Sequence, residues 1–157
     1  MTRAARSPEK IRPLDEHLCF ALYAASNAFT RAYGPLLAPL GLTYPQYLVV
    51  LVLLDEGGED GVSVGRLGER LGLDSGTLTP LLKRLEAAGY VTRARSAEDA
   101  RVVVVTLTRA GRALRARIAE VQHAAACLVG LDRAAAMRLR DAARALRDRL
   151  VVESGAI

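Results

Sequence analysis

The sequence contains no tryptophan and only two cysteines, and aromatic residues make up 4% of the chain. Two cysteines so far apart do not form the disulfide framework of a small secreted domain. The longest strongly apolar run, YLVVLVLL at 47–54, is much shorter than the roughly 20 residues that a membrane-spanning helix requires. The N-terminus also lacks the apolar region of a secretory signal. We therefore expect a cytoplasmic protein with no membrane partner.

The chain does contain enough hydrophobic residues, 51%, to build a packed interior within its 157 residues. Its charge is unevenly distributed. Residues 14–62 carry one Arg against six acidic residues, a net charge of −5, whereas residues 63–109 carry eight basic against five acidic residues, a net charge of +3. The basic balance of residues 63–109 favours a polyanionic partner such as DNA, although an ordinary solvated surface has the same composition.

The N-terminal part of the chain has helical periodicity. Residues 1–13 are expected to form a mobile arm. Apolar residues then recur at helical spacing: Leu18, Leu22, Ala25 and Phe29. This spacing predicts a helix that is capped by Asp15 and reaches about Tyr33. A second long helix begins at TYPQY, with Pro45 in its first turn, where the missing N–H costs nothing, and ends at the turn cluster 55–61.

The middle of the chain predicts a DNA-binding fold. Residues 63–72 form a short helix capped by Ser63, and a second helix, capped by Asp or Ser in the segment DSG, runs to Gly89. Two short helices joined by a tight turn are typical of a helix-turn-helix. Residues 90–108 change to the period of strands, since YVTRARS and VVVVTLT flank the polar turn AEDAR. A helix-turn-helix followed by a basic hairpin is a winged helix.

The remaining residues predict two helices. Thr108 caps a long helix that Gly130 ends, and Asp132 caps a last helix reaching about Val152. Their apolar stripes need a second copy to cover them, so we expect a homodimer whose two recognition helices meet a palindromic operator in double-stranded DNA. The expected fold is mainly α with a small β-hairpin wing. Its parts are an arm at 1–13, N-terminal dimerisation and sensor helices at 14–44, a winged helix-turn-helix domain at 45–109, and C-terminal dimerisation helices at 110–157.

Polar and basic residues of the recognition helix and the wing are the candidates for DNA contact. Small hydroxyl groups at a helix start can approach bases and phosphates closely. The candidates are Ser75, Thr77, Thr79, Lys83, Arg84, Arg93, Arg95 and Arg101. Ser75 and Thr77 have capping as an alternative role. Arg101 has an alternative too, since pairing with Asp99 would fix the wing turn. Arg93 and Arg95 lie on the same face of their strand.

The segment HLCFALY, residues 17–23, places a cysteine one helical turn before a tyrosine. Cys19 would lie in the first turn of its helix, where the helix dipole favours a thiolate and Asp15 and Glu16 oppose it. Tyr23, at i+4, lies on the same face. The alternative is that the cysteine fills space as a small hydrophobic residue.

With these features the sequence resembles the MarR family of bacterial winged-helix regulators, whose Asp-x-Arg wing signature is present as Asp99-Ala100-Arg101. The segments LCFALYAASNAFTRAY, GLTYPQY, LDSGTLTPLLKRLEAAG and RSAEDAR are similar to the organic-hydroperoxide-sensing, OhrR-type branch. The resemblance covers roughly residues 14–112. It implies a repressor that releases its operator when a cysteine is oxidised by an organic hydroperoxide.

The resemblance also implies roles for individual residues. Cys19 would be the peroxide-reactive cysteine, and Tyr23, Tyr33 and Tyr44 would line its pocket, with Tyr33 and Tyr44 supplied by the partner subunit to hydrogen-bond the sulfur. Cys127 lies where the two-cysteine subgroup carries a resolving cysteine, which predicts an intersubunit Cys19–Cys127 disulfide. The alternatives are a helix-packing role for Cys127 and core packing for the tyrosines. For Tyr47 and Tyr90, core packing is the preferred interpretation.

Other functions compete with this one. In the nearest alternative, the same DNA-binding protein responds to a small phenolic or aromatic ligand in the dimer cleft, with Cys19 structural. A thiol peroxidase is disfavoured, because no helix-N-terminal Thr/Cys/Arg arrangement is present, and no enzymatic activity is expected. A non-specific architectural protein would have no use for the Cys/Tyr pattern. No metal or other cofactor is expected, since His17 and His123 stand far apart and Cys19 lacks ligand partners.

Overall fold

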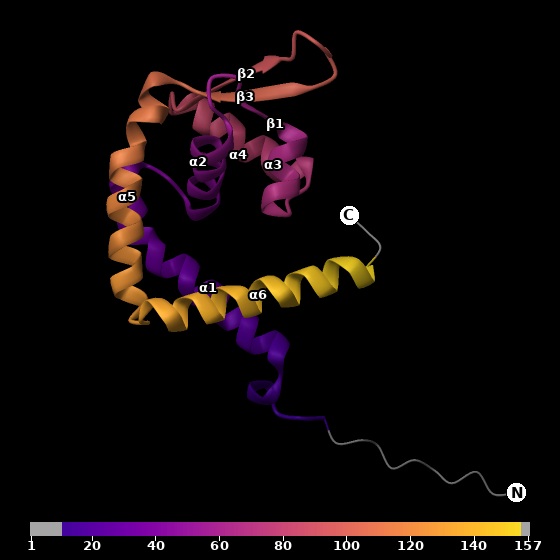
Figure 1. Ribbon diagram of the computed structural model, residues 1–157, viewed down its shortest axis with the longest axis vertical. Helices are drawn as coiled ribbons and strands as arrows, with labels where there is room; N and C mark the ends of the chain where they lie inside the picture. The colour runs from indigo at the N-terminus through magenta and orange to yellow at the C-terminus, as the bar shows by residue number, and fades with distance from the viewer. Residues whose placement is uncertain (1–10, 155–157) are drawn as a thin grey trace, which may run out of the picture.

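The computed structural model describes residues 11–154, so most of the arm expected at residues 1–13 lies outside the described residues. The helices are α1 (Leu18–Leu37), α2 (Tyr44–Glu56), α3 (Val64–Leu71), α4 (Ser75–Ala87), α5 (Arg109–Val129) and α6 (Arg133–Ser154). The strands are β1 (Val62–Ser63), β2 (Val91–Arg95) and β3 (Val103–Leu107). Figure 1 shows α2, α3, α4 and the strands gathered at one end, with the long helices α1 and α5 leading away from it and α6 starting at the far end of α5. This architecture confirms the predicted mainly helical fold with a small wing.

The wing is a three-stranded antiparallel sheet in the order β1-β3-β2. The predicted hairpin is present, with Val91 opposite Leu107 and Arg95 opposite Val103. The third strand, β1, was not predicted. It has only two residues, of which Val62 pairs with Val105, and so short a segment carries no recognisable alternation of its own. By pairing with β3, β1 ties the start of α3 to the wing.

The two helices of the helix-turn-helix begin at side-chain caps. The Ser63 hydroxyl accepts a hydrogen bond from the backbone N–H of Arg66, and Asp74 accepts one from the N–H of Thr77. Between them, Gly72 has a φ of 64°, the left-handed conformation that glycine adopts without steric cost. Pro80 lies inside α4. These helices and their cap residues match the predicted helix-turn-helix.

Helix α2 lies at the centre of the core, in contact with α1, α3, α4, α5 and β3. It begins with a capping box, in which Thr43 and Gln46 satisfy each other's backbone N–H groups. Its buried residues are Gln46, Tyr47, Val49, Val50, Val52 and Leu53. Because leucines of α3 and α4 and valines of the strands pack against this helix, a shift of α2 would move the recognition helix α4.

Helix α1 differs from the prediction at both ends. Asp15 is not its cap, because residues Leu14–Glu16 form a separate 3-10 turn, η1, and the extended backbone of His17 precedes the helix. Cys19 is therefore the second residue of α1. At the other end the helix continues through Pro35 to Leu37 and a further 3-10 turn, η2 (Ala38–Leu40), because a single proline removes one hydrogen bond without ending the helix.

Helices α5 and α6 meet at a sharp corner at Gly130, whose φ is 65° (Figure 1). Thr108 caps α5 by accepting a hydrogen bond from the N–H of Gly111, and Asp132 accepts one from the N–H of Ala135 at the start of α6. Both caps were predicted. No single helix within residues 11–154 is long and apolar enough to cross a membrane, and Leu18–Leu40 with Tyr44–Glu56 passes that test only as a pair bent by 71°.

Candidate functional site

The N-terminal turn of α4 presents three hydroxyl side chains on the exposed surface. Asp74 is the cap, and its carboxylate accepts hydrogen bonds from the N–H of Thr77 at 2.8 Å and from the Thr77 hydroxyl at 3.0 Å. These bonds lower the pKa of the Asp74 carboxyl. The Thr79 hydroxyl donates to the carbonyl oxygen of Ser75 at 2.7 Å. Ser75 is thus not the cap of its helix, whereas Thr77 is part of the capping arrangement.

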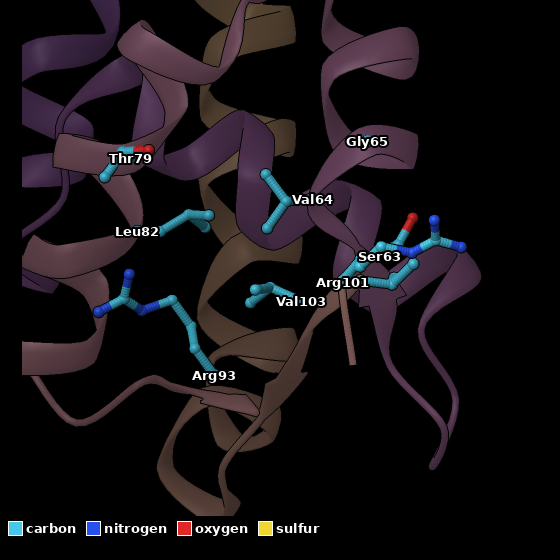
Figure 2. A pocket seen from close by; sticks show the side chains of 9 residues that line it. Ser63, Val64, Gly65, Thr79, Leu82, Arg93, Arg101 and Val103 are labelled. Atoms are coloured by element: carbon cyan, nitrogen blue, oxygen red, sulfur yellow. The ribbon is translucent and has the colours of Figure 1, made fainter. Parts of the chain in front are cut away.

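A hollow of about 460 Å³ lies between this helix, the start of α3 and the wing. Figure 2 shows Ser63 and Val64 from the start of α3, Thr79 and Leu82 from α4, and Arg93, Arg101 and Val103 from the wing around it. Two guanidinium groups and two hydroxyl groups therefore border one concave surface. Lys83 and Arg84 belong to the following turn of α4, where both are exposed.

The turn of the wing is held by Asp99 and Arg101. The Asp99 carboxylate accepts from the backbone N–H of Arg101 at 2.9 Å and from its guanidinium at 3.0 and 3.1 Å. The Arg101 side chain lowers the pKa of Asp99, and Asp99 in turn raises the pKa of Arg101. The side chain of Arg101 nevertheless stays exposed at 90%, so its outer surface is open to a further partner.

The two arginines of β2 have different surroundings. The guanidinium of Arg93 is bound by the carboxylate of Glu86 on α4, with Nε and Oε2 3.0 Å apart. Arg95 is exposed and donates to the carbonyl oxygen of Ala100 in the wing turn at 3.1 Å. Glu86 was not among the predicted site residues, since nothing in the spacing of Glu86 and Arg93 indicates that they meet across the turn at Gly89.

A cluster of aromatic rings joins α1 to the start of α2. The ring centroids of Tyr33 and Tyr44 are 5.0 Å apart, those of Tyr33 and Phe29 are 5.2 Å apart, and those of Tyr33 and Tyr47 are 5.6 Å apart. Burial raises the pKa of Tyr33, Tyr44 and Tyr47, and that of Tyr47 reaches about 12. The structure thus brings Tyr33 and Tyr44 together, with Tyr47 as an additional member.

Two other tyrosines lie outside this cluster. Tyr23 is 66% exposed on α1. Tyr90 packs against the core and donates its hydroxyl hydrogen to the carbonyl oxygen of Leu40 at 2.9 Å, so it has the structural role expected of it. Within the single chain, Tyr23 therefore does not share a pocket with Tyr33 and Tyr44.

Both cysteines are exposed and unbridged. Cys19 and Tyr33 lie fourteen residues apart on the same helix, a separation of roughly 21 Å at 1.5 Å per residue. The Cys19 sulfur therefore cannot contact the Tyr33 hydroxyl of its own chain. Cys127 lies near the end of α5, where Ala125, Leu128 and Val129 line a hollow together with residues of the second half of α1.

A larger apolar groove lies in the angle between α1, α5 and α6. It has a volume of about 610 Å³, and Tyr33, Phe29 and Met137 line it together with Arg133 and Arg140. Many large apolar side chains of these three helices and of the corner between α5 and α6 are exposed: Leu18, Leu22, Phe29, Leu128, Val129, Leu131, Met137 and Leu139. Within the described part of the chain, no group of three or more His, Cys, Asp or Glu side chains is arranged to hold a metal ion.

A helix-turn-helix with a basic wing, set between long helices, defines a winged-helix DNA-binding protein. Residues 40–102 match the model of the MarR family. The chain is 50% identical over 142 residues to the HTH-type transcriptional regulator TtmR of Methylorubrum extorquens, a match that covers 90% of this chain and 71% of that protein. It is 47% identical over 108 residues to the organic hydroperoxide resistance transcriptional regulator of Bacillus subtilis, covering 69% and 71% of the two chains. The chain belongs to the MarR family and is a DNA-binding transcriptional regulator.

The solved structure of reduced AbfR bound to DNA is also similar. It is 33% identical to this chain, with a TM-score of 0.73, and the match covers 88% of this chain and 94% of that one. AbfR of Staphylococcus epidermidis has further structures in an overoxidized state bound to DNA and in a disulfide-formed state. A relative with the same fold has thus been solved in complex with DNA.

Proposed function

We propose that this regulator is a repressor that senses organic hydroperoxides by oxidation of Cys19 and then releases its operator. One observation carries the proposal. The Tyr33–Tyr44 pair lies on the second half of α1 and the start of α2, roughly 21 Å along the helix from the only cysteine of α1. In the sensor branch these tyrosines hydrogen-bond the cysteine of the partner subunit. The separation of Cys19 from Tyr33 and Tyr44 within one chain supports the same arrangement here, because these tyrosines are too far away to reach the cysteine of their own subunit.

In a homodimer, Cys19 of one subunit can reach the tyrosines of the other. The exposed apolar side chains of α1, α5 and α6 form a surface that one chain leaves in contact with water, and a second copy that intertwines with these helices would bury it. Cys19 of one subunit then enters the aromatic pocket of the other. Leu18 and Phe20, beside Cys19 on α1, add apolar surface that favours an organic hydroperoxide over hydrogen peroxide.

The chemistry follows from a thiolate beside phenol donors. The Cys19 thiolate attacks the outer oxygen of ROOH, the O–O bond breaks, and the alcohol ROH leaves after taking up a proton, so that the sulfur becomes a sulfenic acid. The thiol of the partner's Cys127 attacks this sulfur next, forming an S–S bond and releasing water. The two steps together oxidise two thiols and reduce one hydroperoxide. The relatives named for hydroperoxide resistance or solved in disulfide form support this assignment.

DNA binding in the reduced state uses the surface between α4 and the wing. Ser75, Thr77 and Thr79 approach the DNA at the helix start, where the helix dipole favours a phosphate, and Lys83 and Arg84 follow one turn later. Arg95 and Arg101 of the wing contact the backbone or the adjacent groove. Two such surfaces in a dimer match a palindromic operator. The intersubunit disulfide pulls on α1 and α5 and changes the spacing of the recognition helices.

The disulfide has a direct test. The reduced protein is treated with cumene hydroperoxide and run on a non-reducing gel. Wild type is expected to give a covalent dimer that dithiothreitol reverses, whereas Cys19→Ser and Cys127→Ser remain monomers. A wild-type protein that stays monomeric after Cys19 has become oxidised, as read by mass spectrometry, removes the resolving role of Cys127.

The alternative function is a repressor released by a small phenolic or aromatic ligand. The groove of about 610 Å³ favours it, because Phe29 and Tyr33 offer aromatic contacts and Arg133 and Arg140 offer positive charge to a carboxylate. The variant Cys19→Ser separates the two functions. It abolishes a peroxide response and leaves a ligand response intact.

A further inference from the structure

The N-terminal turn η1 and the first residue of α1 form a short segment that is both apolar and acidic. Leu14 in the turn and Leu18 just after it are 61% and 64% exposed. Asp15 and Glu16 lie between them and are exposed as well. Neither carboxylate has a hydrogen-bond or ion-pair partner within residues 11–154. One chain on its own therefore leaves the apolar and the charged side chains of this segment in water.

The groove between α1, α5 and α6 has the complementary character. Its volume is about 610 Å³, its lining includes Phe29 and Met137, and the charged side chains among its described lining residues are Arg133 and Arg140. Arg133 has no side-chain partner in the described part of the chain. The Arg140 guanidinium donates to the carboxylate of the adjacent Asp141 at 2.8 Å and stays 49% exposed. An apolar segment with negative charge matches an apolar groove with positive charge.

The position of the segment in the proposed dimer leads to the same groove. Tyr33 lines this groove, and Cys19 of the partner subunit is the group that approaches Tyr33. The turn η1 ends three residues before Cys19, a distance of roughly 5 to 10 Å along the chain. Arg133 is the first residue of α6 and follows the proposed resolving cysteine, Cys127, by six residues. The approach that brings the partner's Cys19 to Tyr33 therefore also brings the partner's η1 turn to the two arginines.

We propose that this groove is the seat of the N-terminal turn η1 of a second copy of the chain, whose two carboxylates pair with Arg133 and Arg140. The inference rests on the proposed function, because it uses the dimer in which the partner's Cys19 reaches Tyr33. It assigns to the partner subunit the groove that the alternative function assigns to a small ligand. Two-fold symmetry gives each dimer this contact twice, so it fixes the start of α1, and the sensor thiol there, in both subunits.

The test is a charge-swap cycle on the dissociation constant of the dimer. Fluorescence-detected analytical ultracentrifugation measures this constant over a wide range of protein concentration, with dithiothreitol present and no oxidant. The acid variant carries Asp15→Lys and Glu16→Lys, the basic variant carries Arg133→Glu and Arg140→Glu, and the combined variant carries all four changes. All four side chains are exposed in the single chain, so each monomer should fold, which circular dichroism checks.

The matched control carries Arg138→Glu and Arg149→Glu. Both arginines are exposed on α6, roughly 140° to 180° around the helix from Arg133 and Arg140. The control therefore makes the same change of charge on the opposite face of the same helix, and it separates a specific pairing from the effect of net charge.

An exposed ion pair changes an equilibrium by only a few-fold, but the dimer holds this contact twice and charge reversal replaces attraction by repulsion. We expect the acid and the basic variant each to raise the dissociation constant roughly ten- to hundred-fold, and more at low than at high salt. The combined variant should return to within roughly three-fold of wild type, and the control should not differ from wild type.

Losses that add up in the combined variant overturn the pairing. An unchanged dissociation constant in both the acid and the basic variant overturns the seat itself, and 4-hydroxybenzoate binding that requires Arg133 and Arg140 would then assign the groove to a ligand. Failure of the proposed function is distinguishable, because no oxidant is used here. A dimer that obeys the charge swap but keeps its DNA in the presence of peroxide contradicts the sensing by Cys19 and leaves this interface standing.

Discussion

The carboxylate of Glu86, at the end of the recognition helix, binds both the backbone N–H and the guanidinium of Arg93 on the first strand of the wing hairpin. The N–H donates to Oε1 at 3.2 Å and Nε donates to Oε2 at 3.0 Å. The pairing lowers the pKa of Glu86. It fixes the wing relative to α4. It also neutralises the positive charge of Arg93, a residue that the sequence alone predicts to contact DNA.

The first prediction concerns the salt dependence of DNA binding. Because Glu86 already neutralises Arg93, Arg93→Ala should change the slope of log K against log salt by much less than one unit. Arg95→Ala should lower that slope by about one unit and weaken specific and random DNA alike. Fluorescence anisotropy titrations at several salt concentrations measure both. Equal losses for the two variants would mean that Arg93 exchanges Glu86 for a phosphate in the complex.

The second prediction concerns the cap of α4 at low pH. The folded-state pKa of Asp74 is lowered by the Thr77 hydrogen bonds, so its contribution to stability is complete above the unfolded-state value of about 4 and is lost as the pH falls through the folded value. Asp74→Asn keeps a capping oxygen without the titration.

The difference in unfolding midpoint between wild type and Asp74→Asn, measured by urea titration, should therefore shrink as the pH is lowered into the acid range. Asp74→Ala should be less stable than both at neutral pH. A wild-type advantage over Asp74→Asn that stays constant across this range would contradict the role of the charged cap.

The third prediction concerns the junction between the wing and α5. A Cβ atom at Gly111 would lie 2.1 Å from the backbone carbonyl oxygen of Tyr90. Gly111→Ala should therefore destabilise the protein by roughly 2 kcal/mol or more, because neither backbone can move aside cheaply. Gly65→Ala is the matched control, since nothing lies within 4 Å of a Cβ there, and its effect should be below about 1 kcal/mol and stabilising. Chemical denaturation of both variants measures the two effects. Equal stabilities would contradict the close approach of α5 to the wing.

The fourth prediction concerns the apolar surface of α6. Leu139 is 61% exposed and lines the groove beside Tyr33, so Leu139→Glu should shift the protein from dimer to monomer in analytical ultracentrifugation. The control is Val102→Glu, which places the same charge on an exposed apolar residue of the wing and should leave the dimer intact. A variant at Leu139 that remains dimeric at all concentrations would show that this face of α6 does not join the subunits.

Periodicity and caps made most of the fold predictable. The helices bounded by Ser63, Gly72, Thr108 and Gly130 follow from local chemistry that acts within a few residues, and so does the hairpin. The start of α1 could not be predicted from such local signals, because Asp15 takes part in a competing 3-10 turn. Strand β1 was missed because its two residues are ordered by pairing with β3, which lies far along the chain.

Less of the candidate site could be predicted, because its contacts also join residues that lie far apart along the chain. The resemblance names Tyr33 and Tyr44 by their place in a motif, but the contact of the Tyr33 ring with that of Tyr47 joins two helices, and no local pattern indicates it. The capture of Arg93 by Glu86 likewise depends on how α4 packs against β2. Local signals predict elements and side-chain chemistry, whereas the partners of each polar group are set by tertiary packing.

The most direct test of control by Cys19 is fluorescence anisotropy on the DNA upstream of this protein's own gene, with an organic hydroperoxide titrated against wild type and Cys19→Ser. We predict that both reduced proteins bind and that only wild type is released by the oxidant. Release of both proteins, or of neither, would contradict a repressor controlled by Cys19.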